Sequence, residues 1–391
     1  MTQKIYSTPI RKCIISGDKN LKTIFKLPDY PLTEQFGKYE SNFPNVNQEL
    51  LISLKSGHVQ LKNIINQKFL YNDKNYNFQT KVNYKKNHDI KTFVEFIKNL
   101  KIKKIKSILD VGGNDSYIIS QIGDNNSAKF IIDPVGKKNE KNIKVINKFL
   151  EEIDFKKNSI SPDLVICRHT LEHIPDPIKF LNILMKNTKE NCKFVFEVPS
   201  LEFMLEKKRF DTIIHQHISY FDLESLKFLL AKVGCTIKKF LYFNEGSCSG
   251  SLIFYFEKKK NVEIPKIEKK KIIKKYNNII KAKNLYDRQI KDLRNAINEE
   301  NNKIYGYGAG MMLATFFYYL KINHKHMIIF DDEKKKDGKS YKNINVKIKI
   351  PNKKNLKKNL PFLITSLENQ RAILKKILNM NPKKIFVQQI I

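Results

Sequence analysis

The stretch Ser-Ile-Leu-Asp-Val-Gly-Gly-Asn-Asp at residues 107–115 decides the fold class of this chain. Its first five residues, Ser107–Val111, have the apolar composition of a buried strand, and the loop Gly112–Asp115 follows at once. Beyond the loop we expect a helix over Tyr117–Ile122 and a second strand over Lys129–Asp133. A strand, a glycine turn, a helix and a strand that ends in an acidic residue are typical of a nucleoside-binding α/β domain.

The loop and the acidic residue also predict which nucleoside fits. Asp133 comes 21 positions after Gly112, close to the ~20 expected for a carboxylate that accepts hydrogen bonds from ribose hydroxyls. The loop is not the Gly-x-Gly-x-x-Gly that holds a pyrophosphate, so it favours a nucleoside without phosphates, S-adenosylmethionine (SAM). We expect Asp110, Gly112, Asn114 and Asp133 to bind it. The alternative is a flavodoxin-like domain in which this loop is only a turn.

Strands and helices alternate through the middle of the chain, which predicts a parallel α/β sheet. The last two strands resemble an antiparallel pair at its edge. The other expected helices are 86–104, Pro177–Asn187 and Leu223–Val233, and the other expected strands are Ile143–Ile146, Asp163–Cys167, Lys193–Val198, Thr236–Phe243 and Ser251–Phe256.

The same alternation restarts near the C-terminus. We expect strands over Asn302–Tyr307, Met327–Asp331, Phe362–Thr365 and Lys384–Val387, with a glycine-led helix over Gly308–Leu320. The chain is therefore predicted to be an α/β protein of four consecutive parts. These are a small β-rich module (1–80), a SAM-binding domain with a Rossmann-like sheet (81–257), a long exposed linking helix (258–300) and a second, smaller Rossmann-like domain (301–391).

A second segment narrows the function. After the fourth expected strand the sequence reads Cys-Arg-His-Thr-Leu-Glu-His-Ile-Pro-Asp-Pro at 167–177. This resembles the class I SAM-dependent methyltransferases, in which the segment passes along the cofactor before a helix resumes after the proline. We add Phe149, Arg168 and His169 to the expected cofactor site. His173 is a candidate catalytic residue, and a structural helix-cap histidine is the alternative.

Three further pieces resemble one family. They are Ile214-His-Gln-His-Ile-Ser-Tyr-Phe221, Ser249-Gly-Ser-Leu252, and Tyr305-Gly-Tyr-Gly-Ala-Gly310 with Asp331-Asp332 after the next strand. In this order they resemble the three-domain sugar C-methyltransferases that act on nucleotide-activated keto-deoxysugars. The resemblance spans nearly the whole chain. It implies a zinc-binding N-terminal module, a SAM domain and a C-terminal domain that helps to hold the sugar nucleotide, in deoxysugar or surface-polysaccharide biosynthesis.

The N-terminal module departs from that family at the metal site. The family pattern is C-x-x-C near the start and C-x-x-C-G-x-V-Q-L later. Here the aligned positions are Cys13, Ser16, Ser53 and Ser56, and the frame Gly57-His-Val-Gln-Leu61 is kept. A neutral serine hydroxyl is a poor ligand in a closed Cys₄ site. We therefore expect no zinc and assign no metal-binding residue.

The resemblance also implies the chemistry. In the family, a base removes the proton next to a ketone and the resulting enolate attacks the SAM methyl group. The second histidine of the His-Glu-His-x-Ser-Tyr-Phe motif maps to His217, a side chain suited to this task near neutral pH. The intervening glutamate is Gln216 here, and the tyrosine before the motif is Ile214. Gln216 is a further catalytic-site candidate that can hydrogen-bond substrate or orient an imidazole, but it cannot carry charge. A hydroxyl acceptor and O-methylation therefore stay open. Tyr76 is a further catalytic candidate or a core aromatic.

Five residues are assigned to the sugar nucleotide on the strength of the resemblance. They are Ser219, Tyr220, Tyr307, Gly308 and Gly310. A helix N-terminus after the C-terminal glycines would favour phosphate. The Gly306-x-Gly308-x-Gly310 pattern is also compatible with a dinucleotide or with a purely structural turn.

Composition sets the outer limits. The chain has 73 Lys and Arg against 39 Asp and Glu, a net charge of +34, which allows a polyanion partner. Lysine is spread along the chain together with abundant Asn and Ile, as in AT-rich genomes, so we expect no nucleic-acid partner.

No apolar run reaches the ~18 residues of a membrane span, and five scattered cysteines make no disulfide framework. We expect a cytoplasmic protein without a membrane partner and leave its oligomeric state open. The alternatives to a sugar C-methyltransferase are a sugar O-methyltransferase, a nucleic-acid methyltransferase and a non-catalytic relative.

Overall fold

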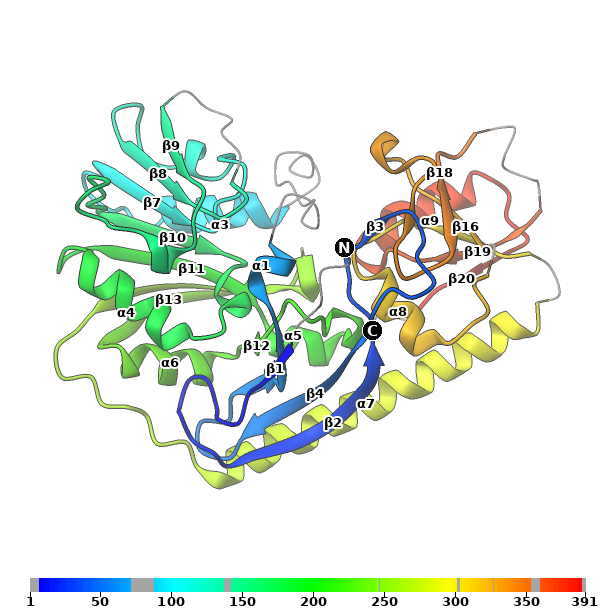
Figure 1. The fold of residues 1–391 in the computed structure, drawn as a ribbon, viewed down its shortest axis with the longest axis horizontal. Coiled ribbons are helices and arrows are strands. Elements are labelled where there is room, and N and C mark those ends of the chain that lie inside the picture. Colours follow the sequence, from blue (N-terminus) through cyan, green and yellow to red (C-terminus); the bar gives the residue numbers. More distant parts are fainter. Residues whose placement is uncertain are drawn as a thin grey trace. The chain divides into compact units, whose positions relative to one another are not determined.

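The computed structural model describes residues 7–71, 88–136, 142–245, 247–300, 303–325, 327–352 and 359–388. The chain forms two compact units, each assembled from segments that are distant in sequence (Figure 1). Unit 1 comprises Met1–Phe25, Glu49–Met204 and Gln216–Asn277, and unit 2 comprises Lys26–Gln48, Leu205–His215 and Asn278–Ile391. Strands β2 (Leu21–Tyr30) and β4 (Val46–Ser53) and helix α7 (Lys269–Asn298) each contribute residues to both units. The division into four consecutive parts stays a prediction.

Unit 1 is built on a seven-stranded mixed sheet of order β13-β14-β11-β10-β7-β8-β9. Every neighbouring pair is parallel except the two that involve β14, so β14 alone runs against the others. The predicted α/β class and the predicted antiparallel edge pair are therefore confirmed. The strands are β7 (Ser107–Val111), β8 (Ala128–Ile132), β9 (Ile143–Ile146), β10 (Leu164–Arg168), β11 (Lys193–Pro199), β13 (Cys235–Phe243) and β14 (Ser251–Lys258).

Helices cover both faces of this sheet (Figure 1). Helix α3 (His88–Lys98) packs into an apolar cluster that contains Ile108, whereas α4 (Pro177–Asn187) and α6 (Leu223–Lys232) pack into one that contains Leu109. Neighbouring strand residues point to opposite faces of a sheet, so a continuous apolar strand such as β7 supplies both clusters. A short helix α5 (Leu201–Glu206) follows β11.

The chain changes direction across this sheet between β7 and β10. From β7 it adds β8 and β9 on one side, and it then returns to place β10 on the other side of β7. Ligands of open α/β sheets bind outside the carboxyl ends of the strands at such a switch point. The Gly112–Asp115 loop follows β7 and His169–Thr170 follows β10, so both predicted cofactor segments lie there.

The described N-terminal residues, 7–71, form several strands and the short helix α1, which agrees with the predicted β-rich character. Strand β1 (Ser7–Pro9) pairs antiparallel with β6 (Asn63–Ile65), and β4 pairs antiparallel with β5 (Val59–Leu61). Strand β5 also pairs with β12 (Ser219–Tyr220). The retained Gly57–Leu61 frame is therefore hydrogen-bonded to the strand that follows the predicted base. Helix α1 (Gln67–Leu70) comes next, capped by the side chain of Asn66.

Unit 2 contains a five-stranded parallel sheet of order β18-β16-β15-β19-β20. Its switch point lies between β15 and β19, beside the Gly308 turn. Strand β18 was not among the predicted elements. The elements are β15 (Tyr305–Tyr307), β16 (Met327–Phe330), β18 (Val346–Lys349), β19 (Pro361–Ile364), β20 (Lys384–Phe386), helices α8 (Leu313–Leu320) and α9 (Gln370–Leu378), and a separate pair of β3 (Phe36–Gly37) with β17 (Ser340–Tyr341).

The predicted long helix forms as α7, with 30 residues. The prediction that it is exposed is wrong for one face, because apolar side chains are buried along it at seven-residue steps. Residues that recur every two turns form one stripe of a helix. Lys275 and Lys283, which lie between these positions, are also largely covered, and each pairs with an aspartate. The buried positions are Ile272, Ile279, Tyr286, Ile290, Leu293 and Ile297.

Two predicted helices are shorter than expected. The segment Tyr117–Ile122 contains only a 3₁₀ turn at Ile119–Gln121. The side chains of Ser120 and Gln121 both donate hydrogen bonds to the carbonyl of Tyr117, which competes with helical bonding of the same group.

The helix expected over Gly308–Leu320 begins only at Leu313. Gly308 has a φ of 97°, outside the helical region, and the chain takes several more residues to enter the helix.

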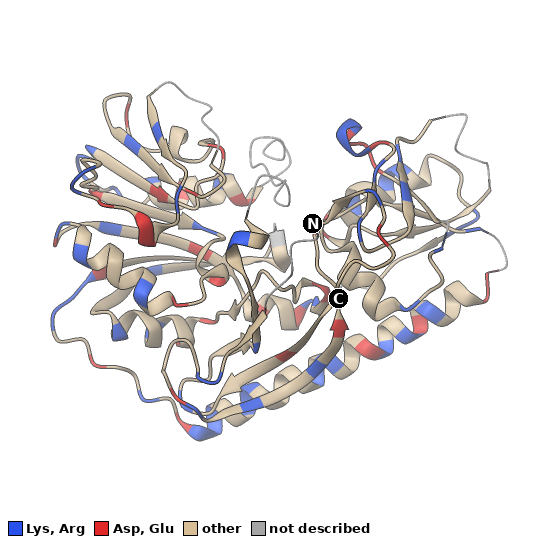
Figure 2. Ribbon diagram, viewed as in Figure 1, with Lys and Arg blue, Asp and Glu red and all other residues tan. Residues whose placement is uncertain are grey.

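Basic residues are distributed over many strands, helices and loops (Figure 2). This agrees with a compositional origin of the net charge. Among the described residues, no helix combines the length and the apolar character that a membrane span requires.

Candidate functional site

The glycine loop at the switch point of unit 1 is shaped by its closest neighbour. Gly112 has a φ of 79°, and a Cβ on it would lie 2.0 Å from the hydroxyl oxygen of Thr170. A Cβ on Gly113 would lie 2.7 Å from the carboxyl group of Asp110. Glycine is therefore required at both positions. A loop without side chains there would let a ligand approach the backbone closely.

The carboxylate of Asp133 organises the same loop. Its Oδ2 accepts a hydrogen bond from the backbone N–H of Asn114 at 3.0 Å, and its Oδ1 accepts one from Val135 at 2.8 Å. Asn114 itself has a φ of 52°, which places its N–H against Asp133. Each carboxylate oxygen has a second lone pair, so these bonds leave acceptor capacity for a ligand hydroxyl.

Three carboxyl groups gather in this loop. Burial raises the pKa of Asp110 well above its ordinary value, and the charges of Asp133 and Asp115 add to that effect. Burial also raises the pKa of Asp133, although the two backbone N–H groups oppose it. The loop therefore concentrates negative potential, and it would be stabilised by a cationic ligand such as a sulfonium.

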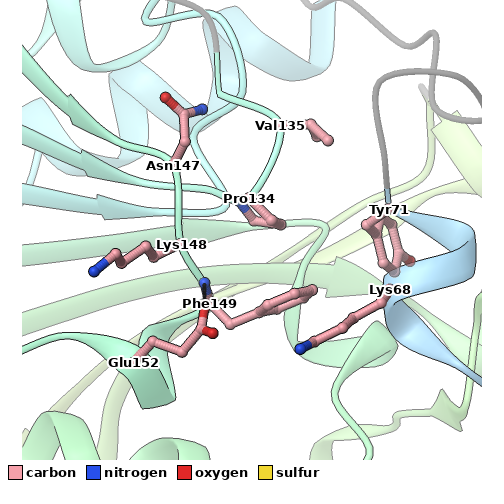
Figure 3. A pocket seen from close by; sticks show the side chains of 8 residues that line it. All are labelled: Lys68, Tyr71, Pro134, Val135, Asn147, Lys148, Phe149 and Glu152. Carbon is pink, nitrogen blue, oxygen red and sulfur yellow. Dashed lines mark hydrogen bonds between the residues drawn. The ribbon is translucent and has the colours of Figure 1, made fainter.

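The two residues that directly follow Asp133 line a pocket of about 270 Å³ (Figure 3). Pro134 and Val135 come from the end of β8, and Phe149 comes from the segment after β9. Lys68 and Tyr71 come from α1 and the residue that follows it. Figure 3 shows Phe149 extending toward Lys68 across the pocket. The pocket is slightly smaller than a typical small-molecule site and has aromatic walls, as a planar base would require.

Arg168, predicted to bind cofactor, is held in a buried ion-pair network. Its guanidinium contacts Asp89 of α3 at 2.6 Å and Glu197 of β11 at 2.5 Å. Burial opposes its charge, but the two carboxylates outweigh burial and raise the pKa of Arg168. The direct partners of Arg168 are therefore protein carboxylates that join a helix to two strands.

His169 lies between two buried carboxylates. Its Nδ1 is 3.3 Å from Oε1 of Glu172, and its Nε2 is 3.2 Å from Oε1 of Glu197. Burial and the charge of Arg168 both lower the pKa of His169, but the two carboxylates outweigh them and raise it to about 9. Its φ of 48° turns the chain sharply after β10. His169 thus has a carboxylate on each side, and these two carboxylates favour its charged form.

The predicted catalytic histidines lie side by side. The ring centroids of His173 and His217 are 4.9 Å apart. His173 Nδ1 is 2.8 Å from the backbone carbonyl of Gln216, so that nitrogen donates the hydrogen bond and Nε2 is the ring nitrogen that faces away from this carbonyl. The backbone N–H of Ile218 donates to the carbonyl of Glu172 at 2.8 Å. Two hydrogen bonds therefore join the segments that carry the two histidines.

Glu172, which the sequence did not single out, completes this group. It is 1% exposed, and its Oε1 is 3.8 Å from Nε2 of His173. Among the described residues, Glu172, His173 and His217 are the one set of such side chains whose ligand atoms lie within 4.8 Å of one another, close enough to share a divalent cation. Burial lowers the pKa of His217 to about 3, with a smaller contribution from His173, while the charge of Glu172 acts in the opposite direction.

The other histidine of the motif has a different place. His215 belongs to unit 2, where its Nδ1 is 3.3 Å from the side-chain amide of Gln48 and its Nε2 is 3.1 Å from the carbonyl of Tyr30. Burial lowers its pKa to about 4. Both ring nitrogens are engaged, which is the pattern of a structural histidine.

The two substrate candidates next to the motif face the N-terminal module and the histidine. The hydroxyl of Ser219 is 3.2 Å from Nε2 of His58 on the adjacent strand. The ring of Tyr220 is 6.4 Å from that of His217. Tyr76 lies outside the described residues.

The positions of the family's zinc ligands remain close together. Cys13 Sγ and Ser56 Oγ are 3.4 Å apart, and the backbone N–H of Ser56 donates to Ser53 Oγ at 3.1 Å. The backbone N–H of Gly17 donates to the carbonyl of Cys13, and that of Gly57 donates to the carbonyl of Ser53. The two turns therefore bring Cys13, Ser53 and Ser56 close together.

Backbone groups of the C-terminal glycine turn in unit 2 are hydrogen-bonded to side chains of the same unit. The backbone N–H of Ala309 donates to Asp331 at 2.7 Å, and Tyr341 donates its hydroxyl hydrogen to the carbonyl of Gly310 at 2.8 Å. Tyr307 donates to Asp332 at 3.0 Å. A Cβ on Gly308 would lie 2.5 Å from Cβ of Ser366. The glycines are thus explained by close packing at this turn, and nucleotide binding there stays a prediction.

Sequence reasoning missed Glu172, Thr170, Tyr71 and Lys68. Glu172 and Thr170 stood within the quoted 167–177 segment, where the choice between His173 and its neighbours needed side-chain directions. Tyr71 and Lys68 are far in sequence from the other residues of the site, and only the folded structure brings them to the pocket. Tyr71 lines the pocket, and its ring centroid is 5.8 Å from that of His173.

Comparison with known proteins agrees with this geometry. A family model described as a methyltransferase domain matches residues 79–239. These residues contain the Gly112 loop, Asp133, the pocket-lining Phe149 and the Glu172–His173 pair. This part of the chain is a methyltransferase domain, which confirms the predicted enzyme class.

The chain is also similar to individual proteins. It is 39% identical over 74 residues to the C-methyltransferase NovU of Streptomyces niveus, which is 19% of this chain and 18% of NovU. The 1,6-didemethyltoxoflavin-N1-methyltransferase of Burkholderia thailandensis matches 45% of this chain and 81% of its own, at 12% identity and a TM-score of 0.37. A SAM-dependent methyltransferase of Clostridium acetobutylicum matches 44% and 92%, at 10% identity and a TM-score of 0.32.

Proposed function

We propose that this protein is a SAM-dependent methyltransferase that adds a methyl group to the carbon next to a ketone in a nucleotide-linked sugar. The observation that carries the proposal is the proximity, within unit 1, of a nucleoside-type pocket and a histidine pair made of half-buried His173 and buried His217. Tyr71 belongs to the wall of the pocket and also contacts His173. A cofactor and an acceptor held on either side of Tyr71 would be within reach of each other.

The cofactor end would use groups that suit an adenosine. The ribose hydroxyls would donate to Asp133, whose oxygens retain free lone pairs, and the base would lie against Phe149. The sulfonium carries a positive charge, which the carboxylates of the Gly112 loop attract. Bound there, SAM supplies an electrophilic methyl group.

At the acceptor end, an imidazole would take the proton. The C–H bond next to the ketone breaks, its electron pair forms the enolate, and the proton passes to His217. The enolate carbon then forms a bond to the methyl carbon while the S–CH₃ pair returns to sulfur, which gives S-adenosylhomocysteine. The proton leaves the imidazole for solvent, so His217 is restored. The protein's own contribution is to align the reacting groups and to hold the proton.

The acceptor class rests on the motif resemblance and on the name of one relative. The His215-Gln-His-Ile-Ser-Tyr-Phe221 segment resembles the sugar C-methyltransferases, and the short similarity to NovU is to a protein called a C-methyltransferase. Gln216 cannot serve as the family's carboxylate, so carbon as the methylated atom is the part of the proposal most in need of a test.

Mass spectrometry with deuterium-labelled SAM tests the proposal directly. The purified protein is incubated with CD₃-SAM and a panel of nucleotide-linked keto-sugars, and a 17 Da gain is expected for an added CD₃ group in place of hydrogen. Fragment ions then separate a methylated carbon from a methylated oxygen. SAM binding by calorimetry without transfer to any member of the panel would contradict the acceptor class, and a CD₃ on oxygen would contradict carbon chemistry.

A further inference from the structure

A buried carboxylate lies against the proposed base without good hydrogen-bond partners. Glu172 is 1% exposed, and among the described residues neither of its oxygens has a hydrogen-bond donor in good geometry. Its nearest polar neighbours are imidazoles: His169 Nδ1 at 3.3 Å and His173 Nε2 at 3.8 Å from Oε1. A buried acid in such a place is costly unless it has a specific partner or task.

The backbone holds this carboxylate in register with both histidines. The carbonyl of Glu172 accepts from Ile218, the residue after His217, and the carbonyl of Gln216 accepts from Nδ1 of His173. These two bonds form a ladder between the 172–173 turn and the 216–218 segment. His173 Nε2 is thereby turned away from Gln216 and toward the carboxylate.

The sequence lacks a carboxylate between the two motif histidines. The family's glutamate between the two motif histidines is Gln216 here, a neutral side chain. A buried imidazole is penalised for becoming charged, and burial lowers the pKa of His217 to about 3. The charge of Glu172 acts against this lowering, so without that anion the imidazole would accept a carbon-bound proton even less readily.

We propose that Glu172 is the positioning residue of the His173–His217 pair: a fixed buried carboxylate that aligns the two imidazoles and stabilises the positive charge they acquire with the substrate's proton. The role of the substrate proton rests on the proposed function, whereas the electrostatic coupling does not. Glu172, on a different loop of the same site, supplies the negative charge that the neutral Gln216 cannot supply.

Other charged groups near this cluster also influence how readily the two histidines become charged. His169 Nδ1 is 3.3 Å from Glu172, and the carboxylates of Glu172 and Glu197 raise its pKa, so it competes with the histidine pair for the carboxylate of Glu172. Beyond it, Glu197 of β11 and Arg168 of β10 form their own pair. Tyr71, the residue after α1, places its ring beside His173. Among the described residues, Glu172 is the anion whose charge raises the pKa of His217.

Histidine NMR tests the coupling without substrate or cofactor. Protein with ¹³C-labelled histidine is titrated as wild type, as Glu172→Gln and as Glu95→Gln, a control that removes an exposed glutamate from α3. The first protonation midpoint of the His173–His217 pair should fall by about one pH unit or more in Glu172→Gln, since the pair loses a close anion. Glu95→Gln should leave it in place. An unchanged midpoint in folded Glu172→Gln overturns the proposal.

A second variant keeps the test valid where Glu172→Gln fails to fold. His169→Asn removes the competing imidazole and keeps Glu172, so the midpoint of the pair should rise. A fall or no change in a folded His169→Asn protein would overturn the proposal.

Activity then separates this role from others. With transfer to a keto-sugar established, Glu172→Gln should lower kcat ~10²-fold with SAM affinity within about threefold of wild type, and Glu172→Asp should recover part of the rate. Absence of SAM binding or transfer in the wild type would refute the proposed function and leave the NMR result to decide on the coupling. Loss of activity in EDTA, restored by Zn²⁺ or Mn²⁺, would make Glu172 a metal ligand and overturn the positioning role.

Discussion

Gly112 and Thr170 contact each other across the switch point of the seven-stranded sheet, with room for hydrogen but not for a methyl group between them. An alanine at position 112 would place its Cβ 2.0 Å from Thr170 Oγ1, at a φ of 79°. The loop after β7 and the segment after β10 are thereby held at van der Waals contact. Three of the expected cofactor residues lie on these two segments, Gly112, Asn114 and His169, and a fourth, Arg168, is the last residue of β10.

Replacing Gly112 by alanine should damage both stability and SAM binding. The left-handed backbone alone costs roughly 1–2 kcal/mol for a residue with a Cβ, and the clash with Thr170 adds to it. Gly17→Ala is the matched control, because Gly17 has a φ of 73° and nothing within 4 Å of its Cβ position. Urea unfolding should show a clearly larger loss for Gly112→Ala than for Gly17→Ala. Thr170→Gly in the Gly112→Ala background should restore part of the difference; equal losses in the two single variants would exclude the contact as the cause.

Asp133→Asn should weaken SAM binding by ~10–100-fold, because an acceptor for ribose hydroxyls loses its charge. Asp163→Asn is the matched control. Asp163 also accepts two backbone N–H bonds, from Lys106 and Ser107, but at the opposite end of β7. Calorimetry should show normal SAM affinity for Asp163→Asn. If both variants bind SAM equally well, Asp133 does not contact the ribose.

The contribution of Asp110 to the stability of the protein should decrease as the pH rises. Burial raises its folded-state pKa well above the ordinary value, so the folded protein binds this proton more tightly than the unfolded chain does. Its contribution therefore favours folding at pH values below the unfolded pKa of ~3.9 and is lost as the pH rises to the folded pKa. Asp110→Asn should raise the melting temperature at pH 8 by more than at pH 4. A variant that is less stable at pH 8 than wild type would show that Arg168 and the loop stabilise the charged form.

His217→Asn should cut turnover by ~10²–10⁴-fold while SAM affinity stays close to wild type, since asparagine cannot take a proton. His88→Asn, on the exposed start of α3, is the control for loss of a histidine. Gln216→Glu restores the family residue and should keep the protein folded. Near-normal turnover by His217→Asn on the true acceptor would move the base to His173.

The purified protein should contain no stoichiometric zinc, and three substitutions should create a site for it. Cys13 and Ser56 already lie 3.4 Å apart. Changing Ser16, Ser53 and Ser56 to cysteine supplies a Cys₄ set on turns of the expected shape, so the triple variant should bind about one zinc per chain. Elemental analysis of both proteins gives the answer. One tightly held zinc in the wild type would falsify the prediction and point to Cys13 and His58 as ligands.

Sequence patterns predicted the strands of the methyltransferase domain to within a residue or two, because a buried parallel strand such as Ser107–Val111 is apolar on both faces. They did worse where local side chains decide the backbone. The helix predicted at Tyr117–Ile122 is replaced by a turn in which Ser120 and Gln121 bond to one carbonyl.

The candidate site was predicted unevenly for a similar reason. The Gly112 loop, Asp133 and the histidine motif could be found, because each is a short sequence pattern whose chemical role is known. Glu172 could not be distinguished from its neighbours, because its role depends on Gln216 and His217, more than forty positions away and joined to it only through the ladder to Ile218. Nor could periodicity reveal that the two compact units interleave along the chain.

The lone reversed strand β14 limits how the protein can be divided for expression. The methyltransferase match ends at residue 239, yet Ser251–Lys258 lies between β11 and β13 and hydrogen-bonds to both. A fragment trimmed to that match would leave the backbone groups of β11 without a partner along an apolar strand, which invites edge-to-edge aggregation. A soluble excised domain has to continue beyond Lys258, so the shortest useful fragment is set by hydrogen bonding and not by the limits of sequence similarity.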